Sequence, residues 1–307
     1  MGLRRARLTA CSLVVLGAAA WASGAVAVRY ASSPSSAPCA ALSPGNHVLH
    51  VDQRPPLLLH VPRGGATSPR PLLLALHGAG ETGADFADDT GFSRLADEER
   101  FLVAYPSAGG PHAFWNMSGQ VPGAPDHVQA LSESLDDIEG AACVDRARVF
   151  ATGVSNGGGM AARLACDVSG RLAGVAAVAG GYRALPPCRP ARALPVLEIH
   201  GTGDTVVPYG GRPPDYAGSV RRWLYQWRRI DGCHGLAKRF SPQPGVTEIA
   251  WTRCAAGIVV AHVRLDRVPH GWPGGPATRT QNGRFAATWR TWQFFRSLPS
   301  RAPATGA

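Results

Sequence analysis

Short apolar runs recur along this chain, separated by stretches rich in glycine and proline. The continuous apolar runs predict buried strands at 57–61, 71–76, 101–105, 149–152, 175–179 and 196–200. Apolar residues at helical spacing predict helices at 92–99, 128–141, 216–230 and 288–298. Strands that alternate with helices are typical of a mostly parallel sheet with helices on both faces. The fold class is therefore α/β, in one domain.

The N-terminus has the pattern of an export leader. Residues 1–7 are basic, 8–28 carry no charge, and Ala25-Val26-Ala27 is a small-residue cleavage motif. We expect a signal peptide at 1–27, a flexible spacer at 28–38, a catalytic domain at 39–298 and a disordered tail at 299–307. An uncleaved membrane anchor is the alternative, because the apolar stretch is just long enough to span a bilayer.

Six cysteines remain beyond the leader, which in an exported chain suggests three disulfides. Cys233 and Cys254 flank two short β segments, which favours their pairing. For the rest, Cys166–Cys188 would tie a helix to the following loop and leave Cys39–Cys143. A zinc site is the competing interpretation, but the sequence has no Cys-x-x-Cys pair.

The formal net charge of +10 does not indicate nucleic-acid binding. Four of the arginines precede residue 30, and without them the charge is +6. The remaining basic residues form no run of five or more, and pairs such as Arg221-Arg222 sit among aromatics at helical spacing. They indicate solvated helix faces.

The segment 149–158 carries the clearest chemical pattern. A β-rich run meets Gly153-Val154-Ser155-Asn156-Gly157, and a helix of small residues follows at once. This strand–turn–helix context predicts a nucleophile elbow that exposes the Ser155 hydroxyl on a sharp turn. The alternative is an ordinary serine in a glycine-rich loop.

A nucleophilic serine needs a base, and the base needs an acid to orient it. In α/β-hydrolases these follow the serine in the order acid, then histidine. Asp204 directly follows the apolar run at 196–200, which favours it as the acid over a loop-capping role. Of the three later histidines, His270 lies in a Gly/Pro loop and is the candidate base. His262 is interpreted as a sheet-face side chain, and His234 lies beside Cys233.

The oxyanion of an acyl-transfer intermediate needs two backbone donors. We expect one from Asn156 and the other from Ala79, with Gly80 as its alternative. We interpret His200 as structural. Trp115 and Trp272 are candidates for the substrate pocket, with core packing as the alternative for each.

Taken together, these motifs resemble those of secreted polyhydroxybutyrate-depolymerase-like esterases, a family that includes feruloyl and acetylxylan esterases. The matching segments run in family order across the chain: 76–78, 143–145, 148–150, 153–158, 200–204, 207–209 and 270–275. The resemblance implies an α/β-hydrolase fold with Ser155 as nucleophile, Asp204 as acid and His270 as base. Many relatives have an Asp-Val-Gly-Phe-like start to the helix before the elbow, where this chain has Asp126-His127-Val128-Gln129.

The sequence therefore predicts a secreted, monomeric serine carboxylesterase that requires no metal or organic cofactor, with a polyester or an esterified polysaccharide as substrate. Hydroxyalkanoate polyester is the first expectation, and feruloyl or acetyl groups on plant xylan are the alternative. Another class of protein also remains open, a non-catalytic exported binding protein built on a hydrolase fold. Membrane contact is expected only through an uncleaved leader.

Overall fold

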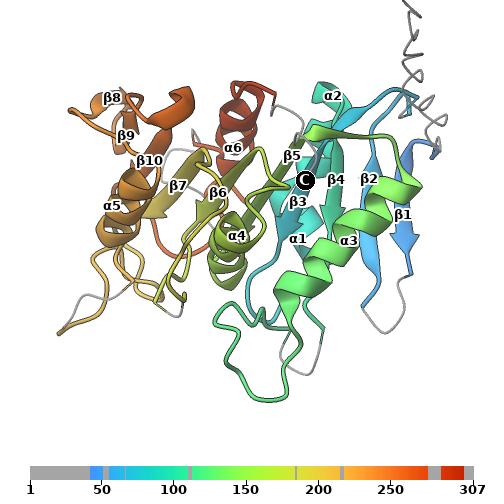
Figure 1. Cartoon of the computed structure of the whole chain (residues 1–307), viewed down its shortest axis with the longest axis horizontal. Helices are drawn as coiled ribbons and strands as arrows, with labels where there is room; N and C mark the ends of the chain where they lie inside the picture. The colour runs from blue at the N-terminus through green and yellow to red at the C-terminus, as the bar shows by residue number, and fades with distance from the viewer. Residues whose placement is uncertain are drawn as a thin grey trace, which may run out of the picture. The chain divides into compact units, whose positions relative to one another are not determined.

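A ten-stranded sheet runs through the part of the chain that the structure describes (Figure 1). The structure is a computed structural model, and it describes residues 42–50, 55–65, 67–109, 113–183, 185–214, 218–275 and 285–300. These residues belong to one unit, Pro38–Ala307. The expected signal peptide, the spacer, Cys39 and most of the expected tail lie outside them.

The strands follow the spatial order β1-β2-β4-β3-β5-β6-β7-β10-β9-β8. The run from β4 to β10 is parallel, and the outer pairs on both sides are antiparallel. The bounds are β1 Gly45–Leu49, β2 Leu57–Val61, β3 Arg70–Leu76, β4 Leu102–Tyr105, β5 Val144–Val154, β6 Gly174–Val178, β7 Val196–Gly201, β8 Lys238–Gln243, β9 Val246–Trp251 and β10 Val260–Leu265.

Helices cover both faces of this sheet, as the alternating sequence pattern predicts (Figure 1). Their bounds are α1 Gly83–Thr90, α2 Phe92–Glu99, α3 His127–Ala141, α4 Asn156–Asp167, α5 Val220–Ile230 and α6 Ala287–Arg296, with a short 3-10 turn at Ala255–Gly257. In the central strand β3, Leu72 and Leu74 belong to the core layer that includes α3, α4 and α5, whereas Leu73 belongs to the layer that includes α1, α2 and α6. The two-residue period of the strand therefore divides the core into two layers.

The structure differs from the sequence prediction at α5. Four residues later than expected, the helix begins at Val220, where the Ser219 side chain accepts a hydrogen bond from the Arg222 amide and caps the helix. Gly218 has a φ of +75°, a left-handed conformation that ends the preceding loop instead of continuing a helix. Helix α1 and edge strand β1 were not predicted. The first begins at a reciprocal cap between Thr82 and Asp85.

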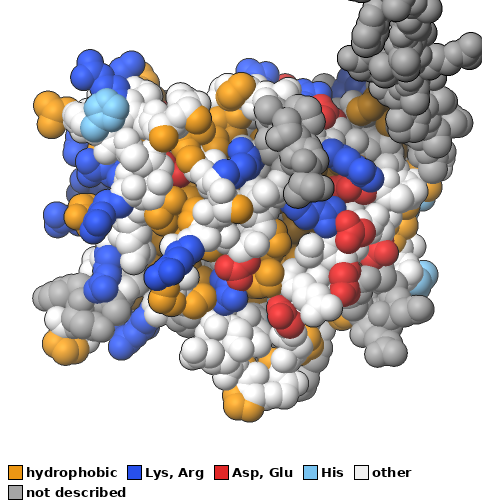
Figure 2. All heavy atoms as spheres, in the orientation of Figure 1, with side chains coloured by type: hydrophobic (Ala, Val, Ile, Leu, Met, Phe, Trp, Pro, Cys, Tyr) orange, Lys and Arg blue, Asp and Glu red, His pale blue; other side chains and the backbone are white. Residues whose placement is uncertain are grey.

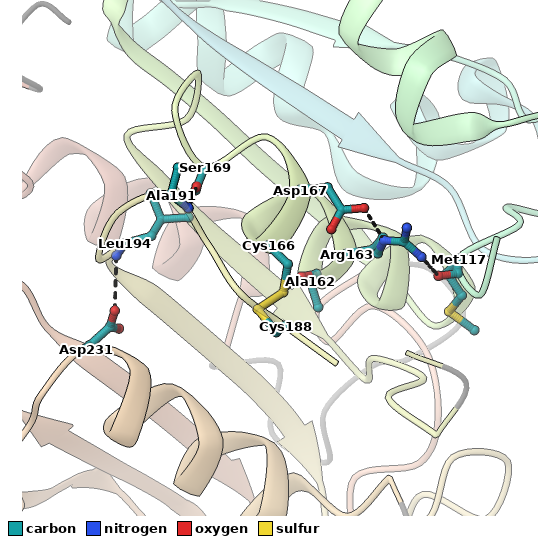
Figure 3. Close-up of a disulfide and its surroundings, with 10 residues drawn as sticks. All are labelled: Met117, Ala162, Arg163, Cys166, Asp167, Ser169, Cys188, Ala191, Leu194 and Asp231. Atoms are coloured by element: carbon teal, nitrogen blue, oxygen red, sulfur yellow. Dashed lines mark hydrogen bonds and ion pairs between the residues drawn. A yellow bond between two sulfur atoms is a disulfide. The ribbon is translucent and has the colours of Figure 1, made fainter. Parts of the chain in front are cut away.

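Two of the three proposed disulfides are present. Cys166–Cys188 ties α4 to the loop after β6 (Figure 3). Cys233–Cys254 links the end of α5 to the segment after β9, so that β8 and β9 lie between the two cysteines. The proposed partner of Cys143 is Cys39, which lies outside the described residues. Since disulfides persist in oxidising compartments, these two agree with an exported protein.

Candidate active site

Ser155 sits at a strained corner between β5 and α4. Its φ of 56° and ψ of −117° are unusual for a residue with a Cβ atom, and its amide donates to the Val178 carbonyl at 2.9 Å. A Cβ at Gly157 would lie 2.2 Å from the Leu76 carbonyl oxygen, and one at Gly153 would lie 2.5 Å from Gly157. Both positions therefore require glycine, which gives the elbow its tight turn.

Asp204 follows β7 at the carboxyl end of the sheet, and its side chain is buried. Its Oδ1 accepts hydrogen bonds from the amides of Val206 at 2.9 Å and Val207 at 2.7 Å. Its Oδ2 lies 2.7 Å from Nδ1 of His270. The carboxylate is thus fixed by its own loop and aimed at one imidazole.

His270 lies in the loop after β10 and is about one-fifth exposed. Its Nδ1 donates to Asp204, which leaves Nε2 as the atom available to a substrate-side group. His270 and Ser155 line the same cavity, of about 300 Å³. The three residues selected from the sequence therefore lie in one region: Asp204 contacts His270, and His270 lines the same cavity as Ser155.

The loops that carry Asp204 and His270 are joined through their backbones. A Cβ at Gly201 would lie 2.0 Å from the Val268 carbonyl oxygen, and one at Gly203 would lie 2.7 Å from that of Arg267. The Gly203 amide donates to Val268, and the Arg267 amide donates to the Thr202 hydroxyl. Such close approach requires glycine and holds the two loops in a fixed relation.

The cavity beside Ser155 has an apolar wall and an acidic rim. Phe86 and Trp272 form an edge-to-face pair on its wall, with ring centroids 5.4 Å apart, and Glu81 and Asp89 also line it. Trp272 therefore lies where a substrate-pocket residue is expected. Trp115 does not line this cavity.

Trp115 instead belongs to the scaffold behind the elbow. Its side chain is buried, its Nε1 donates to the His77 carbonyl at 2.9 Å, and its backbone amide donates to Asn156 Oδ1 at 2.7 Å. Asn156 Nδ2 in turn donates to the Trp115 carbonyl. This paired contact fixes the start of α4 and explains why Trp115 packs in the core and not in the pocket.

The loop after β3 carries Ala79, the residue expected to supply an oxyanion donor. Ala79 lines the cavity, and the neighbouring Gly80 amide is engaged with the Ala113 carbonyl at 3.1 Å. This engagement favours Ala79 over Gly80 as a donor. The Glu81 carboxylate accepts from the Gly78 amide at 2.8 Å and holds the turn. Burial raises the pKa of Glu81.

His77 supports the same loop from behind. Its Nδ1 donates to the Gly78 carbonyl at 2.6 Å, and its Nε2 accepts from the Ala108 amide at 3.0 Å. One nitrogen donates and the other accepts, so the ring is neutral. Burial lowers the pKa of His77, which agrees with this neutral form.

A buried ionic network lies behind Asp204, and the sequence did not reveal it. Nδ1 of His200 lies 2.8 Å from Glu198 Oε1, and its Nε2 lies 2.9 Å from the Val207 carbonyl and 3.2 Å from Asp204 Oδ2. Beyond Glu198, His262 Nδ1 lies 2.7 Å from Glu198 Oε2, and Tyr182 donates to Oε1 at 3.1 Å.

The contacts of His200 define its charge. Both ring nitrogens face oxygen atoms that accept hydrogen bonds, so both carry protons and the ring is an imidazolium. Burial opposes this charge, but the Glu198 carboxylate and Asp204 raise the pKa of His200 to about 10. Burial likewise opposes the charge on Glu198, but His200 and His262 hold the pKa of this carboxyl below its usual value.

This arrangement lowers the pKa of Asp204. Burial alone would favour its neutral form, but the hydrogen bonds from His200, His270 and the Val207 amide hold its pKa well below the usual range. Asp204 is therefore an anion at all physiological pH values. An ionised acid can orient the His270 ring and stabilise its protonated form.

One sequence signal for this network was available. Glu198 and His200 alternate within the otherwise apolar strand β7, so they point to the same face of the sheet. His262 pairs with Glu198 in the register between β10 and β7. Two ionisable residues at i and i+2 in a buried strand require partners, and this requirement indicates a buried network.

The described segments contain neither a metal-ligand cluster nor a membrane-spanning helix. Within them, no group of three or more His, Cys, Asp or Glu side chains is arranged to hold a metal ion. In the same segments, the helices fall short of the length and apolar character needed to cross a bilayer.

Comparison with known proteins places this chain in a family. Residues 56–184 match the family model described as "Esterase PHB depolymerase". NocK of Nocardia uniformis subsp. tsuyamanensis, a protein named as an esterase, is 31% identical over 243 residues, which cover 71% of this chain and 70% of NocK. "Feruloyl esterase B" of Piromyces equi is 29% identical over 219 residues, covering 65% of this chain and 39% of that protein.

The fold also has a solved counterpart. The structure described as "Acetyl xylan esterase from Aspergillus awamori" aligns with a TM-score of 0.60 at 15% identity, over 82% of this chain and 99% of that one. This likeness supports the α/β-hydrolase fold. Together with the family match, it leads to one assignment: the chain belongs to the esterase PHB depolymerase family and is a carboxylic ester hydrolase.

Proposed function

We propose that Ser155, His270 and Asp204 form the catalytic triad of this esterase and that its substrate is an oligomeric or polymeric hydroxyalkanoate ester. The observation that carries the triad is the 2.7 Å contact between Asp204 and His270 beside a serine in a strained elbow. The polyester rests on the family match.

The geometry supports a two-step mechanism. Ser155 Oγ attacks the ester carbonyl and passes its proton to Nε2 of His270, and Asp204 stabilises the resulting imidazolium. The amides of Ala79 and Asn156 donate to the oxyanion. His270 then protonates the leaving alcohol, and the serine is left acylated. Water attacks the acyl-enzyme with His270 as base, releasing the acid and restoring Ser155.

The cavity lining favours an uncharged acyl group. Phe86, Trp272 and Val154 offer apolar surface, whereas Glu81 and Asp89 would repel an anion. An alkanoyl ester unit fits this description. The aromatic pair also suits a feruloyl group, and the similarity to a feruloyl esterase makes that the second candidate.

Export is part of the proposal. Disulfides Cys166–Cys188 and Cys233–Cys254 suit an oxidising compartment, and residues 1–27 have the composition of a signal peptide. An extracellular location would bring the enzyme to a polymer that cannot enter the cell.

A fluorophosphonate probe tests the triad. We expect the folded protein to be labelled on Ser155, and Ser155→Ala to lose both labelling and hydrolysis of p-nitrophenyl butyrate. Ser68→Ala, at an exposed surface serine, is the matched control and keeps both. Undiminished hydrolysis by Ser155→Ala rules out the mechanism, and a folded protein that takes no label favours a binding role.

A substrate panel tests the ester class. Hydroxybutyrate oligomers, methyl ferulate and acetylated xylan are compared by kcat/KM. Preference for the first supports the proposal, and preference for either of the others replaces it.

A further inference from the structure

A second cavity lies between α4 and α5, beside the Cys166–Cys188 disulfide. Its volume is about 360 Å³, which is in the range of small-ligand sites. Aromatic side chains form part of its wall, with Tyr182 stacked on Trp223 at a centroid distance of 4.7 Å and Trp227 next to them. No residue that lines this cavity in the described structure is acidic.

Three arginines line this cavity (the arginine cavity), and one of them already forms an ion pair. Arg163 bonds to Asp167 and to the Met117 carbonyl, as Figure 3 shows beside the disulfide. Arg183 and Arg222 are exposed, and the ion pairs within the described segments involve neither of them. Two such guanidinium groups can bind an anion at the aromatic cavity, because guanidinium groups bind carboxylates in a forked geometry.

Arg183 is held in place by close backbone packing. A Cβ at Gly218 would lie 2.9 Å from the Arg183 amide nitrogen and 3.0 Å from its Cβ. Gly218 also has a φ of +75°, so only glycine suits this position. The main chain of Arg183 therefore has a fixed place on the cavity wall, and its side chain extends from there with solvent exposure.

The wall of this cavity is connected through the backbone to the candidate nucleophile. The Gly181 amide donates to the Ser155 carbonyl at 3.1 Å, and Arg183 follows two residues later, a span of at most about 7 Å. A smaller cavity of about 190 Å³ shares Tyr182 and Arg183 with the arginine cavity. It shares Val206 with the cavity beside Ser155.

Charge changes sign along this path. The cavity beside Ser155 is lined by Glu81 and Asp89, whereas Arg163, Arg183 and Arg222 line the far one. Figure 2 shows that Lys and Arg also gather on the surface around β8, β9 and α5, the helix that lines the far cavity. An ester with an anionic end is oriented by such a gradient.

We propose that the cavity between α4 and α5 is a subsite for a carboxylate of the ester substrate, bound by Arg183 and Arg222 while the scissile ester lies at Ser155. The inference rests on the proposed function. The carboxylate belongs to a substrate longer than one acyl unit. It is either the free acid end of a hydroxyalkanoate oligomer or a uronic acid on an esterified polysaccharide.

The test compares matched substrates with and without the negative charge. We measure kcat/KM for (R)-3-hydroxybutyrate trimer and for its methyl ester. Wild-type enzyme prefers the free acid, and Arg183→Gln and Arg222→Gln each lower the ratio of acid to methyl ester about tenfold. Arg229→Gln removes an exposed charge from the same helix, does not line the cavity and keeps the ratio. Acetylated xylo-oligosaccharides with and without a glucuronic acid branch form the second arm.

The two arms separate the sources of the carboxylate. A charge effect on the trimer alone assigns the subsite to polyester ends, and an effect on the xylo-oligosaccharides alone assigns it to uronic acids. Equal losses on acid and methyl ester, or the same loss in Arg229→Gln, overturn the subsite.

A binding measurement separates failure of the proposed function from failure of the subsite. If no ester is hydrolysed, calorimetry with folded Ser155→Ala protein compares the trimer acid with its methyl ester. Preferential binding of the acid that Arg183→Gln abolishes keeps the subsite, and equal binding removes it.

Discussion

Nε2 of His200 lies 3.2 Å from Oδ2 of Asp204, the same oxygen that contacts His270. A buried imidazolium therefore stands behind the acid of the proposed triad, and Glu198 compensates its charge. Asp204 consequently receives support from a full positive charge in addition to its two loop amides. Glu198 therefore supports the charge of Asp204 through His200, without contacting Asp204 itself.

Glu198→Gln tests this dependence. The loss of the carboxylate lowers the pKa of His200 from about 10, so His200 loses its proton at a lower pH. We expect kcat/KM on p-nitrophenyl butyrate to fall about tenfold, by analogy with lost supporting contacts at other sites. The loss should grow as the pH rises toward 9, and a pH–rate profile measures it.

Glu133→Gln is the control, since Glu133 lies on the exposed face of α3. It should leave the profile unchanged. A Glu198→Gln enzyme that loses activity equally at every pH would show that Glu198 only packs.

Gly157→Ala should damage the elbow. The added methyl group would lie 2.2 Å from the Leu76 carbonyl and 2.3 Å from that of His77, both rigid backbone atoms. We expect unfolding free energy to fall by about 3 kcal/mol or more, with loss of activity. Urea unfolding and ester hydrolysis measure the two effects.

Gly140→Ala provides the opposite outcome. Gly140 lies within α3, and no neighbouring atom lies within 4 Å of the position that an added methyl group would take. Alanine should stabilise the helix by about 0.5–1 kcal/mol and leave activity intact. Similar losses in both variants would contradict the crowding argument.

The elbow was predictable because its chemistry is local. Gly153, Ser155 and Gly157 are near neighbours in sequence, and their strand–turn–helix context is visible in the apolar pattern. Asp204 and His270 were selected by their order and by their loops, and the structure brings them into contact. The parallel sheet was predictable too, because its strands are short, continuous and apolar.

The network behind Asp204 was not predicted, because it depends on strand pairing. Glu198 and His262 are 64 residues apart and meet only through the register of β7 with β10. Trp115 could not be assigned either, since its partner Asn156 lies 41 residues away. Contacts of this kind follow from tertiary packing and leave only a weak local signal.

We expect the buried carboxyl of Asp231 to make the stability of the protein depend on pH. Burial raises the pKa of Asp231 to about 7, although a hydrogen bond from the Leu194 amide to Oδ1 acts in the opposite direction. The other carboxylate oxygen, Oδ2, has no hydrogen-bond partner among the described groups. The unfolded value is about 3.9, so the folded state holds the extra proton between these values. The Asp231 contribution therefore lowers stability as the pH rises from about 4 to about 7.

Asp231→Asn should remove that contribution. We expect a higher melting temperature than wild type at pH 8 and a smaller difference at pH 5, by calorimetry. Asp88→Asn, at an exposed position on α1, should show no such pattern. A variant that is less stable at pH 8 would indicate that the charged form of Asp231 is required.

The two disulfides offer a matched pair. They close loops of 22 and 21 residues, for which chain entropy predicts a stabilisation of about 3 kcal/mol each. Replacing either pair by alanine should cost similar unfolding free energy in urea. Only the Cys166/Cys188 change should alter the acid-to-ester preference, since that disulfide lines the arginine cavity. Equal effects on preference would contradict a local role.

The glycine contacts that join the Asp204 and His270 loops bear on which side chains around the cavity can be substituted. Close packing at Gly201 and Gly203 holds the main chains of the loops that carry Asp204 and His270 in a fixed relation. Exposed side chains on the cavity wall that take no part in these contacts, such as Val206, are therefore expected to be exchangeable without moving Asp204 or His270. We therefore expect a library directed at such exposed wall positions to retain catalytic activity while it changes the preferred ester.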